Sequence, residues 1–174
     1  MRYTLSILVE NRFGELARIL GVFTPRGLNV ESLTVAETLD PAISRVTLVS
    51  EGTPQVIEQV IKQLDKQVRV LKVENMTEVD HIEREMALIN VKAEAGPARQ
   101  EALSLVNIFR AKVVDVSEDG LIIEATGDWK KIRTLINLLK PFGIREIART
   151  GAVAVATLPQ QAGVEQLDEA EVSL

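Results

Sequence analysis

The sequence predicts an α+β protein made of two copies of a β-α-β-β-α-β unit, each an antiparallel sheet with both helices on one face. Four segments repeat apolar residues at i, i+3, i+4 and i+7, the spacing of one face of an α-helix. Strand patterns bounded by turn residues lie between these segments. The order strand, helix, strand, strand, helix, strand occurs twice in 174 residues. We therefore expect a duplication in which each unit closes its own core.

The first unit opens with a strand of period-two apolar residues, followed by a helix that Gly27 ends. Residues 28–37 and 44–52 are predicted strands, joined by the turn-rich segment TLDPAI. Thr53 and Pro54 have the N-cap and N1 preferences of a second helix. The segment VRVLKVE closes the unit as a strand. The apolar residues that define these elements are Leu5, Ile7 and Val9 in the first strand, Leu16, Ile19, Leu20 and Phe23 in the first helix, and Ile57, Val60, Ile61 and Leu64 in the second.

The second unit repeats this order. Its first strand is MALINVKAE, and the pair KVVDVSED and GLIIEATG turns at Asp119-Gly120. Asp128 is the expected N-cap of the last helix, which stops at Pro141 and Gly143, and IREIAR returns as a strand. The helical positions are Ala102, Leu105, Val106 and Phe109, then Ile132, Leu135, Ile136 and Leu139.

These elements predict two ferredoxin-like sandwiches. The expected boundaries are a first domain at residues 1–77, a polar linker at 78–84 and a second domain at 85–158. The acidic segment 159–174 lacks large aromatic residues and is predicted to be disordered.

Composition argues against several classes of function. A net charge of −5 and few aromatic residues disfavour nucleic-acid binding, and no helix-turn-helix pattern flanks the units. The chain has no cysteine and one histidine, His81, so neither a metal site nor a Ser-His or Cys-His nucleophile is expected. The first turn also lacks the repeated glycines of an acylphosphatase-like phosphate loop. No apolar run reaches the roughly 20 residues of a membrane span, and the N-terminus resembles neither a signal nor a transit peptide, so we expect a cytoplasmic protein.

The turn ENRFGE, between the first strand and the first helix, is the candidate binding site. A helix N-terminus presents free N–H groups and favours an anion, and Gly14 leaves room for a carboxylate to approach. Asn11 offers a donor and an acceptor, enough to orient a small zwitterion. On the residues alone the alternative stays open that Asn11 only caps the helix, because Asn and Gly are common in turns.

Asn29 extends this hypothesis to a dimer. A helix of about 12 residues, roughly 18 Å long, separates Asn11 from Asn29, so one chain cannot bring both to one small ligand. The strand that Asn29 opens is an edge strand in a ferredoxin-like sheet, and exposed edges favour pairing. Antiparallel pairing of two such edges about a twofold axis would bring Asn29 of one chain near the Asn11–Gly14 turn of the other, giving two equivalent sites per homodimer.

The sequence resembles a known family over about residues 2–157. The segments LSILVENRFGELARILGVFTPRGLNVESLTVA, RVTLVSEG and VIKQLDKQVRVLKV, followed by HIEREMALINVKA, IFRAKVVDVSED and GIREIARTGAVAVAT, resemble the regulatory small subunit of acetohydroxyacid synthase, also called acetolactate synthase. The resemblance implies an N-terminal ACT domain, the ferredoxin-like module that binds amino acids, and a second ferredoxin-like domain.

The resemblance also implies a function. The family's small subunit is not catalytic and needs no cofactor. It activates a large subunit that uses thiamine diphosphate, Mg²⁺ and FAD, and it confers feedback inhibition by valine, sometimes by leucine or isoleucine. The effector-contacting pattern falls on Asn11, on the backbone of Gly14, Glu15 and Leu16, and on Asn29 and Val30 of the neighbouring subunit. A stand-alone ACT regulator of another enzyme is the alternative.

The second unit departs from the ACT pattern. Its turn KAEAGPARQE has no Asn in the place of Asn11, and Pro97 removes one N–H donor near the helix start. We therefore expect no second amino-acid site there, and instead contact with the large subunit or support of the dimer. Trp129 is expected to pack at a sheet edge, and Tyr3 to lie on the outer face of the first strand.

Overall fold

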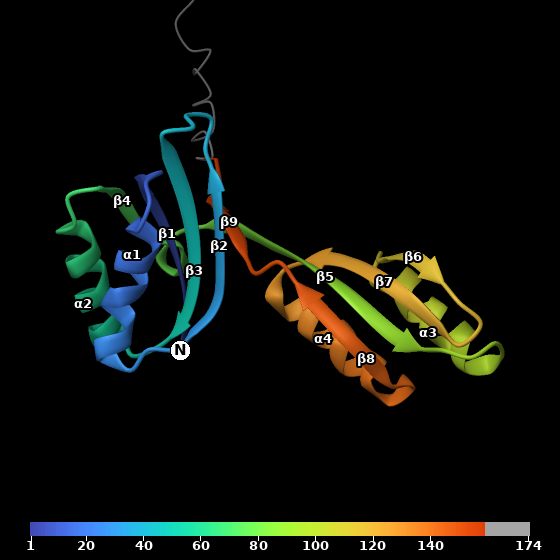
Figure 1. Cartoon of the computed structure of the whole chain (residues 1–174). Helices are drawn as coiled ribbons and strands as arrows, with labels where there is room; N and C mark the ends of the chain where they lie inside the picture. The colour runs from blue at the N-terminus through green and yellow to red at the C-terminus, as the bar shows by residue number, and fades with distance from the viewer. Residues whose placement is uncertain (159–174) are drawn as a thin grey trace, which may run out of the picture.

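The computed structural model describes residues 1–158, and the predicted disordered segment 159–174 lies outside the described residues. The first unit contains a four-stranded antiparallel sheet of order β2-β3-β1-β4, with both helices on one face (Figure 1). Its elements are β1 (Arg2–Glu10), α1 (Glu15–Phe23), β2 (Val30–Glu37), β3 (Ile43–Glu51), α2 (Pro54–Asp65) and β4 (Val70–Asn75).

The second unit repeats this arrangement with the order β6-β7-β5-β8. Its elements are β5 (His81–Lys92), α3 (Pro97–Ile108), β6 (Lys112–Val116), β7 (Gly120–Gly127), α4 (Trp129–Leu139) and β8 (Ile144–Arg149). The predicted fold class is confirmed. Each sheet buries alternate residues against its helices, so each unit has its own apolar core.

The sequence signals for helix ends act as predicted. The Thr53 hydroxyl accepts from the amide of Val56 at 3.4 Å, and the Asp128 carboxylate accepts from the amide of Lys131 at 2.7 Å. Gly27 has a φ of 62° and ends the short 3₁₀ turn Thr24–Arg26 that extends α1. Tyr3 differs from prediction: its side chain is 5% exposed and belongs to the first core, because it alternates in phase with Leu5.

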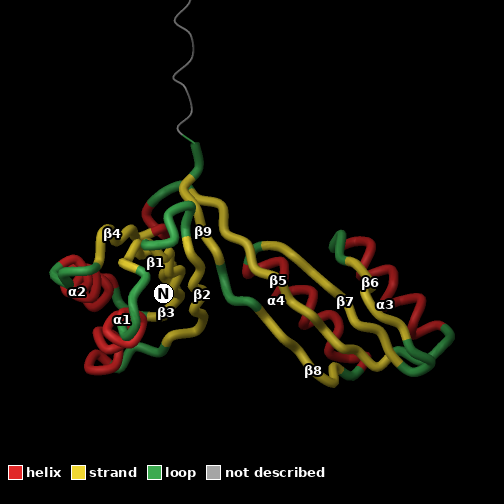
Figure 2. The backbone as a smooth tube through the Cα atoms, turned by 45° about the horizontal axis from the view of Figure 1, so that its top comes forward, coloured by secondary structure: helices red, strands yellow, loops and turns green. Residues whose placement is uncertain are grey.

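The largest difference from prediction concerns the linker. The sequence predicts a solvated linker at 78–84, but β5 already begins at His81 and continues without a break into the second sheet (Figure 2). The polar side chains of this stretch are paired: Glu83 accepts from Arg2 and from Thr4, at 3.0 and 2.9 Å. A strand stabilised by ion pairs across the molecule has no apolar period, and so its start was not visible in the sequence.

The start of β5 pairs with a strand that the sequence analysis did not predict. Residues His81–Arg84 pair antiparallel with β9 (Val153–Ala156). This ribbon, together with the 3₁₀ turn Met76–Glu78, packs on the face of the first sheet opposite its helices. Several side chains of that face are consequently buried to 3% exposure or less: Thr4, Ser6, Thr47 and Val49. The small alternating residues of GAVAVA were the available signal for β9.

Candidate functional site

The turn between β1 and α1 leaves a helix N-terminus open. Gly14 is the N-cap of α1, with a φ of 85° and no side-chain cap. A Cβ atom at Gly14 would meet no atom within 4 Å, so the space in front of the helix is free. The Glu15 amide donates to the Arg12 carbonyl at 3.3 Å, whereas the amides of Leu16 and Ala17 have no acceptor within residues 1–158. The turn therefore presents backbone N–H donors and a positive dipole end to solvent.

Asn11 is fixed beside this turn, but it does not cap the helix. Its Nδ2 donates to Glu37 Oε1 at 3.1 Å and to the carbonyl of Pro41 at 3.0 Å. Its backbone amide donates to the carbonyl of Ala42 at 2.7 Å. The capping alternative for Asn11 is thus wrong, because the side chain is anchored to the connection between β2 and β3. The anchored amide orients the Asn11 side-chain oxygen, which accepts no hydrogen bond from residues 1–158.

Glu15 points inward. Its side chain is 3% exposed, and Oε1 lies 2.8 Å from Arg69 Nη1 and 3.5 Å from Arg18 Nη1. The carboxylate is therefore neutralised behind the turn, and only the backbone of Glu15 faces the open space. Leu16 is 36% exposed on the first helical turn. Phe13, which the sequence analysis did not select, has a fully exposed side chain at the tip of the turn.

Asn29 and Val30 lie at the opposite end of β2 from Asn11. Asn29 is exposed, and its carbonyl accepts from the Ser50 hydroxyl at 2.8 Å. Val30 begins β2 and packs against the first core. Glu37, which anchors Asn11, is the last residue of β2, so the two halves of the predicted site are separated by an eight-residue strand, about 23 Å long. One chain does not bring them together.

The strand β2 is an edge strand. It pairs with β3 on one side, and no strand within residues 1–158 pairs with its other side. A free edge with Asn29 at its start and the Asn11 anchor at its end has the geometry that an antiparallel twofold pairing requires.

The equivalent turn of the second unit is bonded to the β6–β7 hairpin by Arg99. Gly96 is the N-cap of α3 and Pro97 occupies its first position. The guanidinium of Arg99 reaches back across the turn and donates to the carbonyls of Ala93, Ser117 and Glu118, each at 2.7 Å from Nη2. Arg99, a residue of α3 itself, thus bonds the turn to the β6–β7 hairpin.

Every helix in residues 1–158 is too short or too polar to span a bilayer. No group of three or more His, Asp or Glu side chains in the same range is arranged to hold a metal ion.

Comparisons with known proteins cover both units. A family model described as the AHAS small subunit-like ACT domain matches residues 5–72, and one described as the small subunit of acetolactate synthase matches residues 84–157. The chain is 50% identical to a probable acetolactate synthase small subunit of Archaeoglobus fulgidus, over 89% of this chain and 96% of the relative. It is 49% identical to the acetolactate synthase small subunit of Aquifex aeolicus, over 88% and 80%. The crystal structure of the acetolactate synthase small subunit from Thermotoga maritima aligns with a TM-score of 0.80 at 41% identity, over 91% of this chain and 98% of that one.

Proposed function

Because the chain belongs to the family of acetolactate synthase small subunits, we propose that it activates a large catalytic subunit and makes it sensitive to feedback inhibition by valine. The large subunit would bind thiamine diphosphate, Mg²⁺ and FAD and condense pyruvate with a second 2-keto acid. This chain would contribute no catalytic residue. Its role would lie in the biosynthesis of branched-chain amino acids in the cytoplasm.

The open N-terminus of α1 is the observation that carries the proposal. The effector carboxylate approaches the amides of Leu16 and Ala17 over Gly14, where no side chain intervenes. Asn11, anchored to Glu37, offers its side-chain oxygen to the ammonium group. Leu16, exposed on the same helical turn, provides an apolar contact for the effector side chain. The buried pairing of Glu15 with Arg69 keeps a carboxylate away from the anion.

The second half of the site comes from another copy of this chain. Two β2 edges that pair antiparallel bring Asn29 and Val30 of one chain to the end of β2 that carries Glu37 and Asn11 in the other. The effector then bridges two chains. It stabilises the dimer arrangement that it binds best, and the catalytic subunit responds to that shift.

Titration calorimetry of the purified chain tests the proposal. We expect heat of binding with valine, and weaker or comparable heat with leucine and isoleucine, because one methylene in an apolar pocket is worth only about 1–3 kcal/mol. Reconstitution with the large subunit should then give higher activity and inhibition by the amino acid that binds. Absence of heat with all three amino acids would overturn the effector assignment. Binding without any effect on acetolactate synthase would favour the stand-alone regulator.

A further inference from the structure

Residues Thr150–Ala152, where the chain leaves β8 for β9, lie directly against β2. The Thr34 hydroxyl donates to the carbonyl of Thr150 at 3.2 Å, and the amide of Ala152 donates to the Ser32 hydroxyl at 2.9 Å. Both hydroxyls project from the face of β2 opposite the helices. The same strand that provides the free edge of the first unit is therefore bonded to the second unit through its side chains.

Gly151, between these two bonds, has no room for a side chain. Its φ of 82° is a left-handed conformation that favours glycine, and a Cβ atom would lie 2.7 Å from Ser32 Oγ and 2.9 Å from Thr34 Oγ1. Both atoms are the ends of side chains, so an added methyl group would turn the Ser32 and Thr34 hydroxyls away or move the Thr150–Ala152 segment, and either change would disturb the hydrogen bonds of this contact. A displacement of β2 would reach this segment through the two hydrogen bonds that Ser32 and Thr34 make with it.

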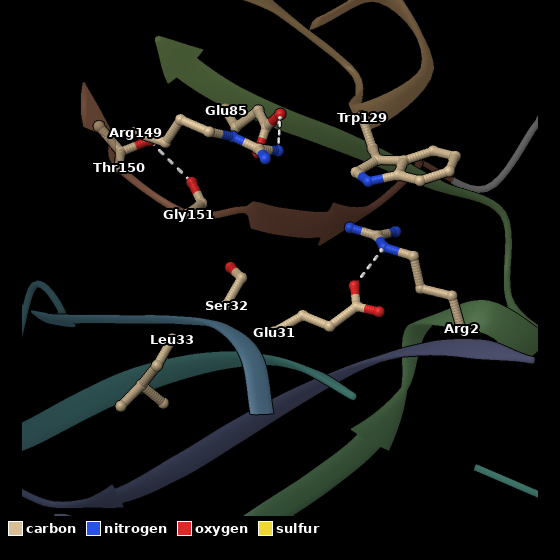
Figure 3. Close-up of a pocket in the computed structure, with 9 residues that line it drawn as sticks. All are labelled: Arg2, Glu31, Ser32, Leu33, Glu85, Trp129, Arg149, Thr150 and Gly151. Atoms are coloured by element: carbon tan, nitrogen blue, oxygen red, sulfur yellow. Dashed lines mark hydrogen bonds and ion pairs between the residues drawn. The ribbon is translucent and has the colours of Figure 1, made fainter. Parts of the chain in front are cut away.

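A cavity of about 260 Å³ adjoins this contact and extends to Trp129 (Figure 3). Arg2 crosses it: its guanidinium lies 3.0 Å from Glu83, 3.5 Å from Glu31 on β2, and 5.4 Å from the centre of the Trp129 ring. Arg133 covers the same ring at 4.2 Å. The Trp129 indole, at the start of α4, thus contacts two cations, and one of them, Arg2, is paired with Glu31 of β2.

We propose that two contacts transmit effector binding from the edge of β2 to the second unit: the contact of Gly151 with Ser32 and Thr34, and the stacking of Arg2 on Trp129. These two contacts together are called the joint. This inference rests on the proposed function, since it assumes an effector that engages β2. When effector binding shifts β2, Ser32 and Thr34 move the Thr150–Ala152 segment, and Glu31 moves Arg2. The first route ends at the part of the cavity lining formed by Thr150 and Gly151, and the second at the part formed by Trp129.

Trp129 is the only tryptophan of the chain, so the tryptophan fluorescence of the purified chain comes from this residue alone. The first experiment needs no effector. We expect Gly151→Ala to shift the emission of Trp129 and to increase its quenching by acrylamide. Gly143→Ala is the matched control: Gly143 has a φ of 91°, but a Cβ there meets only Lys92, at an ordinary 3.6 Å. The control has comparable backbone strain and should leave Trp129 unchanged.

A second pair of variants removes bonds without adding atoms that clash. The double variant Ser32→Ala, Thr34→Val loses both hydrogen bonds to the second unit and should loosen the joint. Its control is Thr134→Val, because the Thr134 hydroxyl bonds only within α4, to the carbonyl of Lys130 at 2.8 Å. If Gly151→Ala and the double variant both leave Trp129 emission and quenching as in the wild type, the joint does not exist as proposed.

Effector titrations separate this inference from the proposed function. In the full-length wild type we expect valine to change Trp129 fluorescence. In the double variant we expect valine binding by calorimetry to persist, while the fluorescence change and the inhibition of the reconstituted holoenzyme are lost. Valine binding without a Trp129 response in the wild type overturns the joint and leaves the proposed function intact. Absence of binding heat overturns the proposed function and, with it, the transmission assigned to the joint.

Discussion

The two units of this chain place a strand, a glycine turn and a helix at equivalent positions, yet the two turns differ in what occupies them. At the first turn, Gly14 leaves open space before α1, and Asn11, the first residue of the turn, bonds the turn to the connection between β2 and β3. At the second turn, Arg99 of α3 makes the tie with its own guanidinium, and Pro97 removes an amide. The two turns of the duplicated fold thus differ in their donors and ties: α3 has one amide fewer at its start than α1, and a side chain of α3 bonds its turn to the β6–β7 hairpin.

The two sheets also differ in how far the face opposite the helices is covered. The first sheet is covered on its second face by the β5–β9 ribbon, and Val49 there is 0% exposed. On the corresponding face of the second sheet, Leu88 is 37% exposed. The first unit therefore offers an open turn and a strand edge, and the second offers a partly exposed sheet face.

A charge in the first turn should have the largest effect. Gly14→Asp places a carboxylate beside the effector carboxylate, at a cost of about 1–4 kcal/mol for charges 4 Å apart, so valine should bind roughly fivefold to a thousandfold more weakly. Calorimetry and inhibition assays of the holoenzyme measure this loss, while activity without valine should remain.

Gly96→Asp sharpens the comparison, because Gly96 is the equivalent N-cap, with a φ of 131° and no atom within 4 Å of a Cβ. We expect this variant to bind valine like the wild type. If Gly96→Asp weakens valine binding as much as Gly14→Asp does, the assignment of the site to the first turn is wrong.

Mixing two variants, each of which has lost inhibition by valine, should restore part of that inhibition. Gly14→Asp damages the turn half of the site and Asn29→His the strand half, so each variant alone should be insensitive to valine. In a homodimer that shares its sites, a mixed dimer contains one site with both halves intact. Equal mixing with random pairing restores about a quarter of the sites. No recovery in the mixture, measured as valine inhibition of the reconstituted holoenzyme, would indicate that both halves act within one chain.

Much of the fold was predictable because it rests on local patterns. The helix carrying Ile57, Val60 and Leu64 buries those residues at 1% exposure or less, as its spacing predicts. The start of β5 was not predictable, because Glu83 is paired with Arg2, a partner 81 residues away in the sequence. At the site, Gly14 and its open turn could be selected from the sequence. The hydrogen bonds of Arg99 at the second turn could not, because they depend on carbonyls that only folding brings together. The free edge of β2 could be predicted from the topology of the fold, but the contact of Gly151 with Ser32 and Thr34 of β2 could not.

Removing the side chain of Arg99 should lower the stability of the second unit. Arg99→Ala loses charged hydrogen bonds to three backbone carbonyls, and water replaces part of them, so we expect a loss of about 2 kcal/mol in the free energy of unfolding. Arg12→Ala is the control in the first turn: its exposed pair with Glu10 should contribute less than about 0.5 kcal/mol. Urea denaturation measures both. Equal losses of stability in the two variants would show that Arg99 does not hold the second turn more firmly than Arg12 holds the first.

The smallest expected effect concerns the pH response of the β6–β7 turn that Arg99 reaches. The hydrogen bond from Arg145 Nη2 at 2.6 Å, followed by that from Ser117 Oγ at 2.9 Å, lowers the pKa of Asp119 below its ordinary value. A lowered folded-state pKa stabilises the fold above the unfolded-state value near 3.9, and this contribution is lost as the pH falls through the folded-state pKa.

Arg145→Ala should therefore raise the pKa of Asp119 toward its ordinary value, as measured by NMR titration of its carboxyl carbon. The difference in stability between this variant and the wild type should be present at neutral pH and vanish in acid. Glu58 in the first unit is the internal reference: a hydrogen bond and the charge of Lys62 lower its pKa, and Arg145→Ala should leave it unchanged. If the pKa of Asp119 stays low in the variant, Ser117 and the backbone of the turn hold the carboxylate, and the tie between β8 and this hairpin is weaker than the 2.6 Å contact indicates.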